Sequence, residues 1–162
     1  MQKYIWTLIV LLTGFCFSTA ALAATRVKLS PTDAATRITR QMIKDNEISS
    51  DCVQQENGDP LKMVSIKRIN ISVPEGEAYL IEGGGDACCR GARRCAQWVY
   101  ERSESGPFVK LLGPVLGDDL KPAQKITNGK RDLILSLPGG YSYPPSKEHY
   151  RFDGYQYQEV KY

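Results

Sequence analysis

The stretch PAQKITNGKRDLILSL, residues 122–137, indicates the fold of this chain more directly than any other. Asn128-Gly129 separates PAQKIT from DLILSL, a run rich in branched apolar residues. Asn-Gly is a strong short-range hairpin signal, because both central residues of a type I′ turn need a positive φ. The stretch therefore predicts two antiparallel strands joined by a two-residue turn.

Three more pairs of strand-like segments flank this hairpin. They are MVSIKRINISV (63–73) with EAYLIE (77–82), AQWVYER (96–102) with FVKLL (108–112), and HYRF (149–152) with YQYQEV (155–160). Asp153-Gly154 is a further two-residue turn signal, and a change of alternation near Lys67 and Arg68 predicts a β-bulge. No crossover helix lies between the segments, so we expect an antiparallel meander of about eight strands, curled into a partly closed barrel or a sandwich.

One helix precedes the predicted strands. Ser30-Pro31-Thr32-Asp33 is typical of a helix start, with a Ser N-cap, Pro at the first position and an acid in the first turn. Ala35, Ile38 and Met42 then recur at helical spacing and predict an amphipathic helix that ends near Asn46. The fold class is therefore α+β, mainly antiparallel β, with an N-terminal amphipathic helix.

The first 23 residues have the pattern of a secretory signal peptide. Lys3 precedes an apolar run over residues 5–17, and Ala21-Leu22-Ala23 forms a small-x-small cleavage site. We expect residues 24–162 to form a single periplasmic or secreted domain that does not insert into the membrane after cleavage. The chain's net charge of +3 is too mild to favour nucleic acid or a membrane as the partner.

Four cysteines lie beyond the predicted signal peptide: Cys52, Cys88, Cys89 and Cys95. An even number in a chain bound for an oxidising compartment predicts two disulfides. Adjacent cysteines pair only with strain. Two connectivities are left, Cys52–Cys88 with Cys89–Cys95, or Cys52–Cys89 with Cys88–Cys95.

The segment GGGDACCRGARRC, residues 83–95, holds three of these cysteines and three arginines, Arg90, Arg93 and Arg94. It lacks the spacing of a phosphate-binding loop, of a zinc site and of a CxxC redox pair, so we expect no cofactor and no metal. The arginines are either a solvated loop tip or a disulfide-pinned patch whose guanidinium groups recognise an acidic partner.

A second candidate recognition loop is PGGYSYPP, residues 138–145. Its glycines and prolines cannot continue a strand, so Tyr141 and Tyr143 lie on a loop. These tyrosines either form a protein-binding edge, since tyrosine brings contact area at low entropic cost, or fold back over the edge of a sheet.

Catalytic chemistry has little support in this sequence. His149 is the only histidine and lies on a predicted strand, and Asp118-Asp119 fall in a polar turn. We therefore expect no catalytic residues. The alternatives are an envelope hydrolase that uses His149 or Asp118 and Asp119, or a structural accessory subunit of an envelope complex.

The order of motifs from residue 83 to residue 157 resembles a group of small, uncharacterised exported bacterial proteins. The shared pattern is a Cys-to-Cys loop before an aromatic strand, a TNGxxD hairpin and a C-terminal YxFDGxxY hairpin. The matching positions are Thr127, Asn128, Gly129, Asp132, Phe152, Asp153, Gly154 and Tyr157. The resemblance implies that Cys89 and Cys95 are the loop cysteines, and that the additional Cys88 bridges to Cys52.

These observations together predict a non-enzymatic, disulfide-stapled binding protein of the periplasm or the medium. Its partner would be another protein. The loop with the three arginines (residues 83–95, the Cys loop) and the Tyr-rich loop (residues 138–145) would contact that protein. An inhibitor of an envelope-acting enzyme, or an immunity protein against a toxin, fits a small chain poor in catalytic groups.

Overall fold

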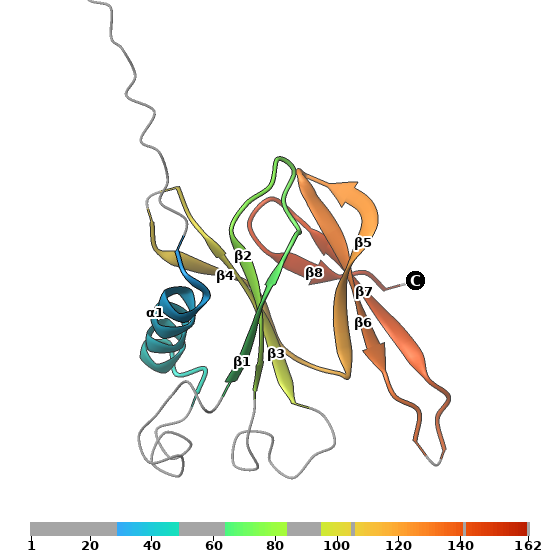
Figure 1. Ribbon diagram of the computed structural model, residues 1–162. Coiled ribbons are helices and arrows are strands. Elements are labelled where there is room, and N and C mark those ends of the chain that lie inside the picture. Colours follow the sequence, from blue (N-terminus) through green and yellow to red (C-terminus); the bar gives the residue numbers. More distant parts are fainter. Residues whose placement is uncertain (1–28, 49–63, 84–94, 105, 141, 162) are drawn as a thin grey trace, which may run out of the picture.

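The computed structural model describes residues 29–48, 64–83, 95–104, 106–140 and 142–161 (Figure 1). These residues form one helix and eight strands: α1 (Pro31–Lys44), β1 (Val64–Ile69), β2 (Ala78–Gly83), β3 (Ala96–Arg102), β4 (Phe108–Leu116), β5 (Asp119–Thr127), β6 (Lys130–Leu137), β7 (Ser146–Phe152) and β8 (Tyr157–Glu159).

The strands form two antiparallel sheets of four, β1-β2-β3-β4 and β5-β6-β7-β8. Within each sheet every strand pairs with the next one along the chain, as in a meander. The prediction of one helix followed by eight antiparallel strands is confirmed. The described strands do not close into a barrel, because the meander divides between β4 and β5 and the two halves pack as a sandwich.

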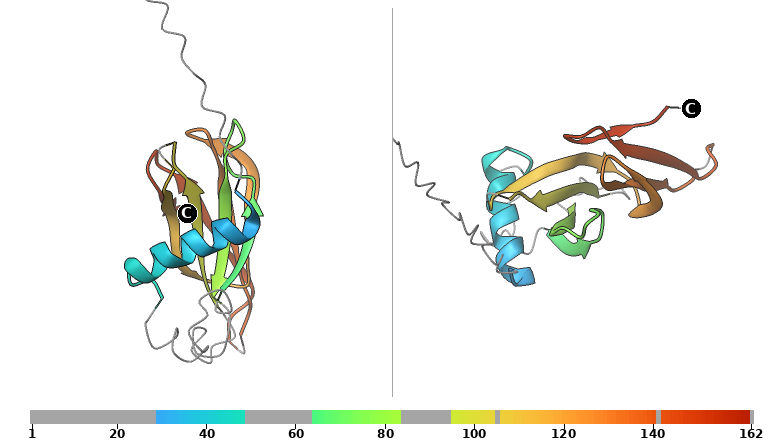
Figure 2. Two further views of the ribbon diagram at one scale, coloured as in Figure 1. Left: turned by 60° about the vertical axis from the view of Figure 1, so that its left-hand side comes forward. Right: turned by 90° about the horizontal axis from the view of Figure 1, so that it is seen from above.

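The molecule has three layers, with the β1–β4 sheet in the middle (Figures 1 and 2). One core lies between the two sheets, where Val99 and Leu112 meet Leu133, Leu135 and other apolar side chains. The other core lies between α1 and the β1–β4 sheet, where Ile38 and Met42 of α1 are fully buried with Tyr100 and their neighbours. The middle sheet is therefore buried on both faces, which explains its continuous apolar runs.

The first strand, β1, contributes side chains to both cores, and its pairing corrects the prediction of a β-bulge. Ile66 packs in the helix core, whereas Ile69, three positions later, packs in the core between the sheets. The pairing of β1 with β2 is continuous from Val64 to Ile69, without a bulge at Lys67 and Arg68. The alternation changes phase because each end of β1 buries a different face.

Local signals at the helix act as predicted. The Ser30 hydroxyl accepts a hydrogen bond of 3.1 Å from the Asp33 backbone N–H, and Pro31 occupies the first helical position. Just beyond the helix, Glu47 ties α1 to the middle sheet: its Oε2 accepts a 3.0 Å hydrogen bond from Trp98 Nε1, and its Oε1 pairs with the Lys110 ammonium.

Two turns predicted by the same rule have different outcomes. Asn128 and Gly129 both have positive φ, 50° and 77°, and they join β5 to β6 directly, as predicted. The Asp153-Gly154 turn is longer than two residues, since β7 ends at Phe152 and β8 begins only at Tyr157. Asp153 Oδ1 accepts hydrogen bonds from the backbone N–H groups of Tyr155 and Gln156, which makes a four-residue loop more favourable than a tight turn.

Among the described residues, no helix is both long enough and apolar enough to cross a membrane.

Candidate functional site

One end of the sandwich gathers the segments that the sequence marks for recognition. Ala96, the first residue of β3, pairs with Leu116 at the end of β4. Gly117 and Asp118 then lead directly into β5, whose Asp119 pairs with Ser136 near the end of β6. We call this the loop end; it carries Gly83, Cys95, Gly117, Asp118 and the β6–β7 loop (lower part of Figure 1).

Tyr143 of the β6–β7 loop is 78% exposed. Its backbone is held in place: the Gly140 N–H donates to the Tyr143 carbonyl at 2.9 Å, and the Tyr143 N–H donates back to the Gly140 carbonyl at 3.4 Å. A Cβ atom at Gly139 would lie 2.9 Å from the Tyr143 carbonyl oxygen and 2.9 Å from Pro145 Cδ. The loop therefore requires glycine at 139 to close, and it presents the tyrosine outward rather than folding it over the sheet edge.

Several predicted site residues lie outside the described residues. These are Cys52, Cys88, Cys89, Arg90, Arg93, Arg94 and Tyr141. Cys95 is described and is half-buried immediately before β3. Both described residues that flank segment 84–94, Gly83 and Cys95, lie at the loop end, the end that also presents Tyr143. The disulfide pairing and the arginine patch stay predictions.

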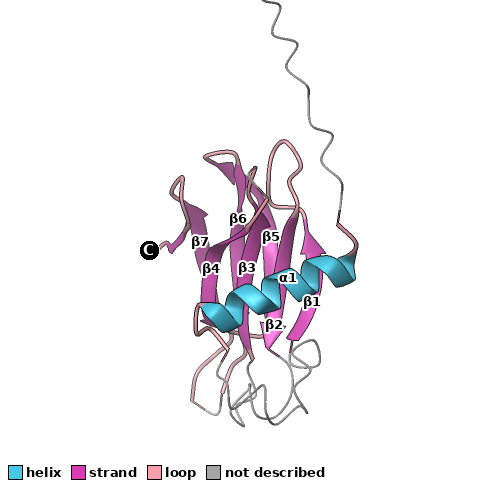
Figure 3. Ribbon diagram, turned by 90° about the vertical axis from the view of Figure 1, so that its left-hand side faces the viewer, coloured by secondary structure: helices cyan, strands magenta, loops and turns pink. Residues whose placement is uncertain are grey.

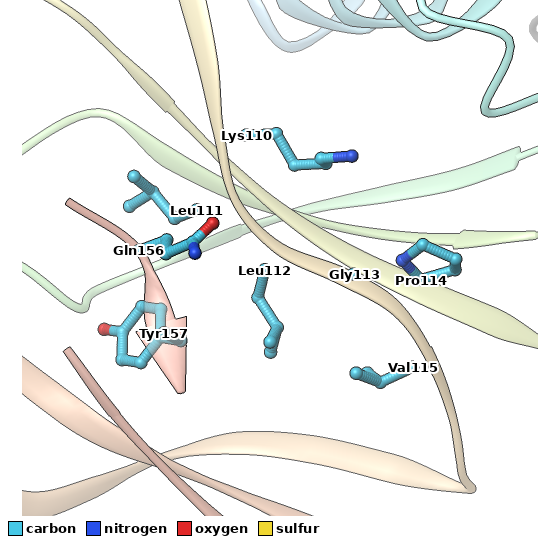
Figure 4. A pocket seen from close by; sticks show the side chains of 8 residues that line it. All are labelled: Lys110, Leu111, Leu112, Gly113, Pro114, Val115, Gln156 and Tyr157. Atoms are coloured by element: carbon cyan, nitrogen blue, oxygen red, sulfur yellow. The ribbon is translucent and has the colours of Figure 1, made fainter. Parts of the chain in front are cut away.

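A pocket of about 230 Å³ lies at the open side of the sandwich, between the edge strand β4 and the start of β8 (Figure 4). Its lining residues are Lys110, Leu111, Leu112, Gly113, Pro114, Val115, Gln156 and Tyr157. Sites for drug-sized ligands usually enclose roughly 300–1,000 Å³. The pocket beside β4 is smaller than this range.

The shape of β4 creates this pocket. The pairing of β4 with β3 slips twice, once at Leu111 and again around Gly113-Pro114, so β4 bulges away from a regular ladder. Gly113 has a φ of +109°, and a Cβ atom there would lie 2.6 Å from the Gln97 carbonyl oxygen. Bulges and proline at an edge strand hinder open-ended pairing with other chains.

A polar cluster among the described residues joins the two sheets. Lys130 Nζ, at the start of β6, lies 2.5 Å from Glu101 Oε2 of β3 and 2.9 Å from Ser72 Oγ. The Ser72 hydroxyl in turn donates to Glu101 Oε1. An ammonium group that donates to a hydroxyl cannot also accept its proton, so this arrangement is an ion-pair network rather than an activated serine.

The residues of the hydrolase alternative are not brought together. His149 lies in the middle of β7 opposite Ile134, on the face of the sheet that points away from the core. Asp118 and Asp119 lie at the β4–β5 connection, two strands from His149, on the order of 10 Å across the sheet. Neither aspartate nor the histidine lines the pocket beside β4. The described residues contain no group of three or more His, Cys, Asp or Glu side chains placed to hold a metal ion.

The two hairpin motifs that carry the family resemblance contact each other. Asn128 Nδ2 donates a hydrogen bond of 2.9 Å to the Phe152 carbonyl, and the Tyr157 hydroxyl donates one of 2.7 Å to the Arg131 carbonyl. Asp132 faces Arg151 at 3.8 Å. Hydrogen bonds from the backbone N–H groups of Gln156 and Tyr155 hold the pKa of the Asp153 carboxyl below its ordinary value. These motif residues hold the β5–β8 sheet together.

Sequence reasoning missed the pocket beside β4. The signal was present in Gly113-Pro114, because a proline inside a strand pattern marks an edge strand or a bulge. FVKLL predicts a strand that stops at Leu112, whereas β4 continues to Leu116.

Comparison of the chain with protein-family models, with characterised proteins and with solved structures finds no match.

Proposed function

We propose that this chain is a non-enzymatic binding protein that recognises a protein partner through its loop end. The observation that carries the proposal is Tyr143, which is 78% exposed on a loop closed by two backbone hydrogen bonds. A tyrosine on a preorganised loop offers a large contact area, and little conformational entropy is lost when it binds. Tyrosine is also among the residues that most often dominate binding energy at protein interfaces.

Tyr141 and the three arginines of the Cys loop extend this surface in the proposal. The described flanks of both loops support it, since Cys95 and Ser146 lie at the same end of the sandwich. Guanidinium groups pair with carboxylates through two parallel hydrogen bonds, so an acidic patch on the partner is the expected complement.

The compartment and the covalent framework belong to the same proposal. Residues 1–23 are removed on export, the domain acts in the periplasm or the medium, and two disulfides fix the Cys loop. An envelope-acting enzyme or a toxin is the proposed partner, and the chain acts as its inhibitor or immunity protein.

The proposal is tested by using the exported chain as bait for envelope proteins, alongside two matched variants. Tyr143→Ser removes the aromatic ring at the loop end. Tyr155→Ser removes one that is 88% exposed on the β7–β8 loop, at the opposite end. A partner retained by the wild type and by Tyr155→Ser, and lost by Tyr143→Ser, supports the proposal. Equal retention by all three chains overturns it.

A further inference from the structure

The outer face of α1 carries a row of positive charges. Arg37, Arg40 and Lys44 follow one another at i, i+3 and i+7, and all three side chains are exposed. They lie on the side of the helix opposite Ile38 and Met42, which are fully buried against the middle sheet. Within the part of the chain that the structure describes, none of the three makes an ion pair or a side-chain hydrogen bond.

The acidic residues beside this basic row keep their negative charge, but neither Asp33 nor Asp45 forms a described ion pair with it. Asp33 is bound to the Ser30 hydroxyl at the N-terminus of α1. Asp45, just beyond the helix, accepts two hydrogen bonds from Gln41 Nε2, at 3.0 and 2.9 Å. The outer face of the β5–β8 sheet is different, because its Lys121 and Arg151 lie within 4 Å of Asp119 and Asp132, at 2.5 and 3.8 Å.

The helix lies across the outside of the β1–β4 sheet and forms the outermost layer on its side (Figure 3). The rise of an α-helix places Arg37 and Lys44 about 10 Å apart along the axis, with Arg40 between them. Because the three side chains line up along one side of the helix, all of them can contact a planar array of anions at the same time. The apolar face of the helix is already used in the core, so such contact involves no insertion of the helix.

We propose that the Arg37–Arg40–Lys44 row docks the exported domain on the anionic phospholipid headgroups of a membrane surface. Arginine and lysine bind phosphate groups, arginine through its planar fork. Basic side chains close to an anionic bilayer each contribute modestly and add up along the surface. Three basic side chains are too few for the many phosphate contacts that binding to nucleic acid requires. This attachment goes beyond partner recognition and uses a different layer of the molecule from the loop end.

The test is cosedimentation of the secreted form of the chain with vesicles of phosphatidylcholine alone, or of phosphatidylcholine and phosphatidylglycerol in equal parts. Two variants with the same change of charge are compared. One carries R37Q, R40Q and K44Q on α1. The other carries K121Q, K125Q and K147Q, three exposed lysines of the β5–β8 sheet.

We expect the wild type to bind only the phosphatidylglycerol vesicles, and to be released by salt. The α1 variant should lose roughly 100-fold in partition coefficient, and the lysine variant should bind nearly as well as the wild type. Equal losses in the two variants, or no binding of the wild type, would overturn the proposal. Saturable binding of an acidic envelope protein by the wild type but not by the α1 variant, without vesicle binding, would assign the row to a protein partner instead.

Discussion

The hydroxyl group of Tyr157 donates a hydrogen bond of 2.7 Å to the backbone carbonyl of Arg131, which joins β8 to the start of β6 across the intervening strand β7. Tyr157 is 5% exposed, and its ring packs against Phe152 with centroids 5.5 Å apart. The short strand β8 is therefore held by one aromatic side chain as well as by its ladder. By contrast, the hydroxyl of Tyr100, a residue that is fully buried, has no hydrogen-bond partner among the described residues.

This contrast predicts opposite effects of the same substitution. Tyr157→Phe should lower the free energy of unfolding by about 1 kcal/mol, because it leaves the Arg131 carbonyl without its donor. Tyr100→Phe should leave the stability unchanged or raise it, because it removes a buried hydroxyl with no described partner. Urea unfolding of the two variants measures both values. A clear loss of stability in Tyr100→Phe would show that its hydroxyl is bonded after all.

The buried tyrosines predict a loss of stability at alkaline pH. Burial, followed by the hydrogen bond to Glu77, raises the pKa of Tyr79 to about 12. Burial also raises the pKa of Tyr100, Tyr150 and Tyr157. In the unfolded chain tyrosines lose their protons near pH 10, so the stabilisation is complete below about pH 10 and is lost as the pH rises through the folded values.

Urea midpoints measured from neutral pH to about pH 12 should therefore fall above about pH 10. Phenolate absorbance followed in parallel should show a group of tyrosines that ionises only with unfolding. Full ionisation of all tyrosines near pH 10, in a chain that keeps its folded circular dichroism, would contradict this account.

The ion pair between Lys130 and Glu101 is predicted to contribute far more to the free energy of unfolding than a surface pair does. Its side chains are 13% and 18% exposed, whereas those of Lys121 and Asp119 are 65% and 48% exposed. Lys130→Met should cost about 3 kcal/mol, because it leaves a carboxylate buried without its cation. Lys121→Met should change the free energy of unfolding by less than about 1 kcal/mol. Similar losses of unfolding free energy in both variants would show that burial does not set the contribution of these ion pairs.

Much of the fold could be predicted from the sequence because it is encoded locally. Ser30 and Pro31 mark the start of the helix, and Asn128-Gly129 has the positive φ angles that a two-residue turn demands. The division of the meander between β4 and β5 could not be predicted in this way. It depends on which faces of β1 and β4 become buried, and Ile66 and Ile69 show that a single strand can bury one face at each end.

The candidate site could be predicted only in part, for a related reason. The exposure of Tyr143 follows from the glycines and prolines around it. The pocket depends on contacts between β4 and β8, which lie far apart in the chain. The two-residue turn that Asp153-Gly154 predicts did not form, because hydrogen bonds to the Asp153 side chain favour a longer loop. Net charge also conceals the basic row on α1, because it averages over all faces of the molecule.

The proposed disulfides predict a covalent framework that can be mapped directly. Digestion of the secreted chain without reductant should yield linked peptides in one of the two connectivities, with Cys52 joined to Cys88 or to Cys89. Loss of either bridge should reduce the free energy of unfolding by about 2–4 kcal/mol. Four free thiols in the native secreted chain would refute the stapled loop.

The central claim, recognition of a protein partner at the loop end, is tested most directly by the dissociation constant of the purified partner for Tyr143→Ser. If Tyr143 anchors the interface, this variant should bind about 30-fold more weakly than the wild type, as expected for a residue worth about 2 kcal/mol. Tyr155→Ser, which removes an even more exposed ring at the opposite end, should bind like the wild type. An unchanged dissociation constant for Tyr143→Ser, or equal weakening in the two variants, would contradict the claim.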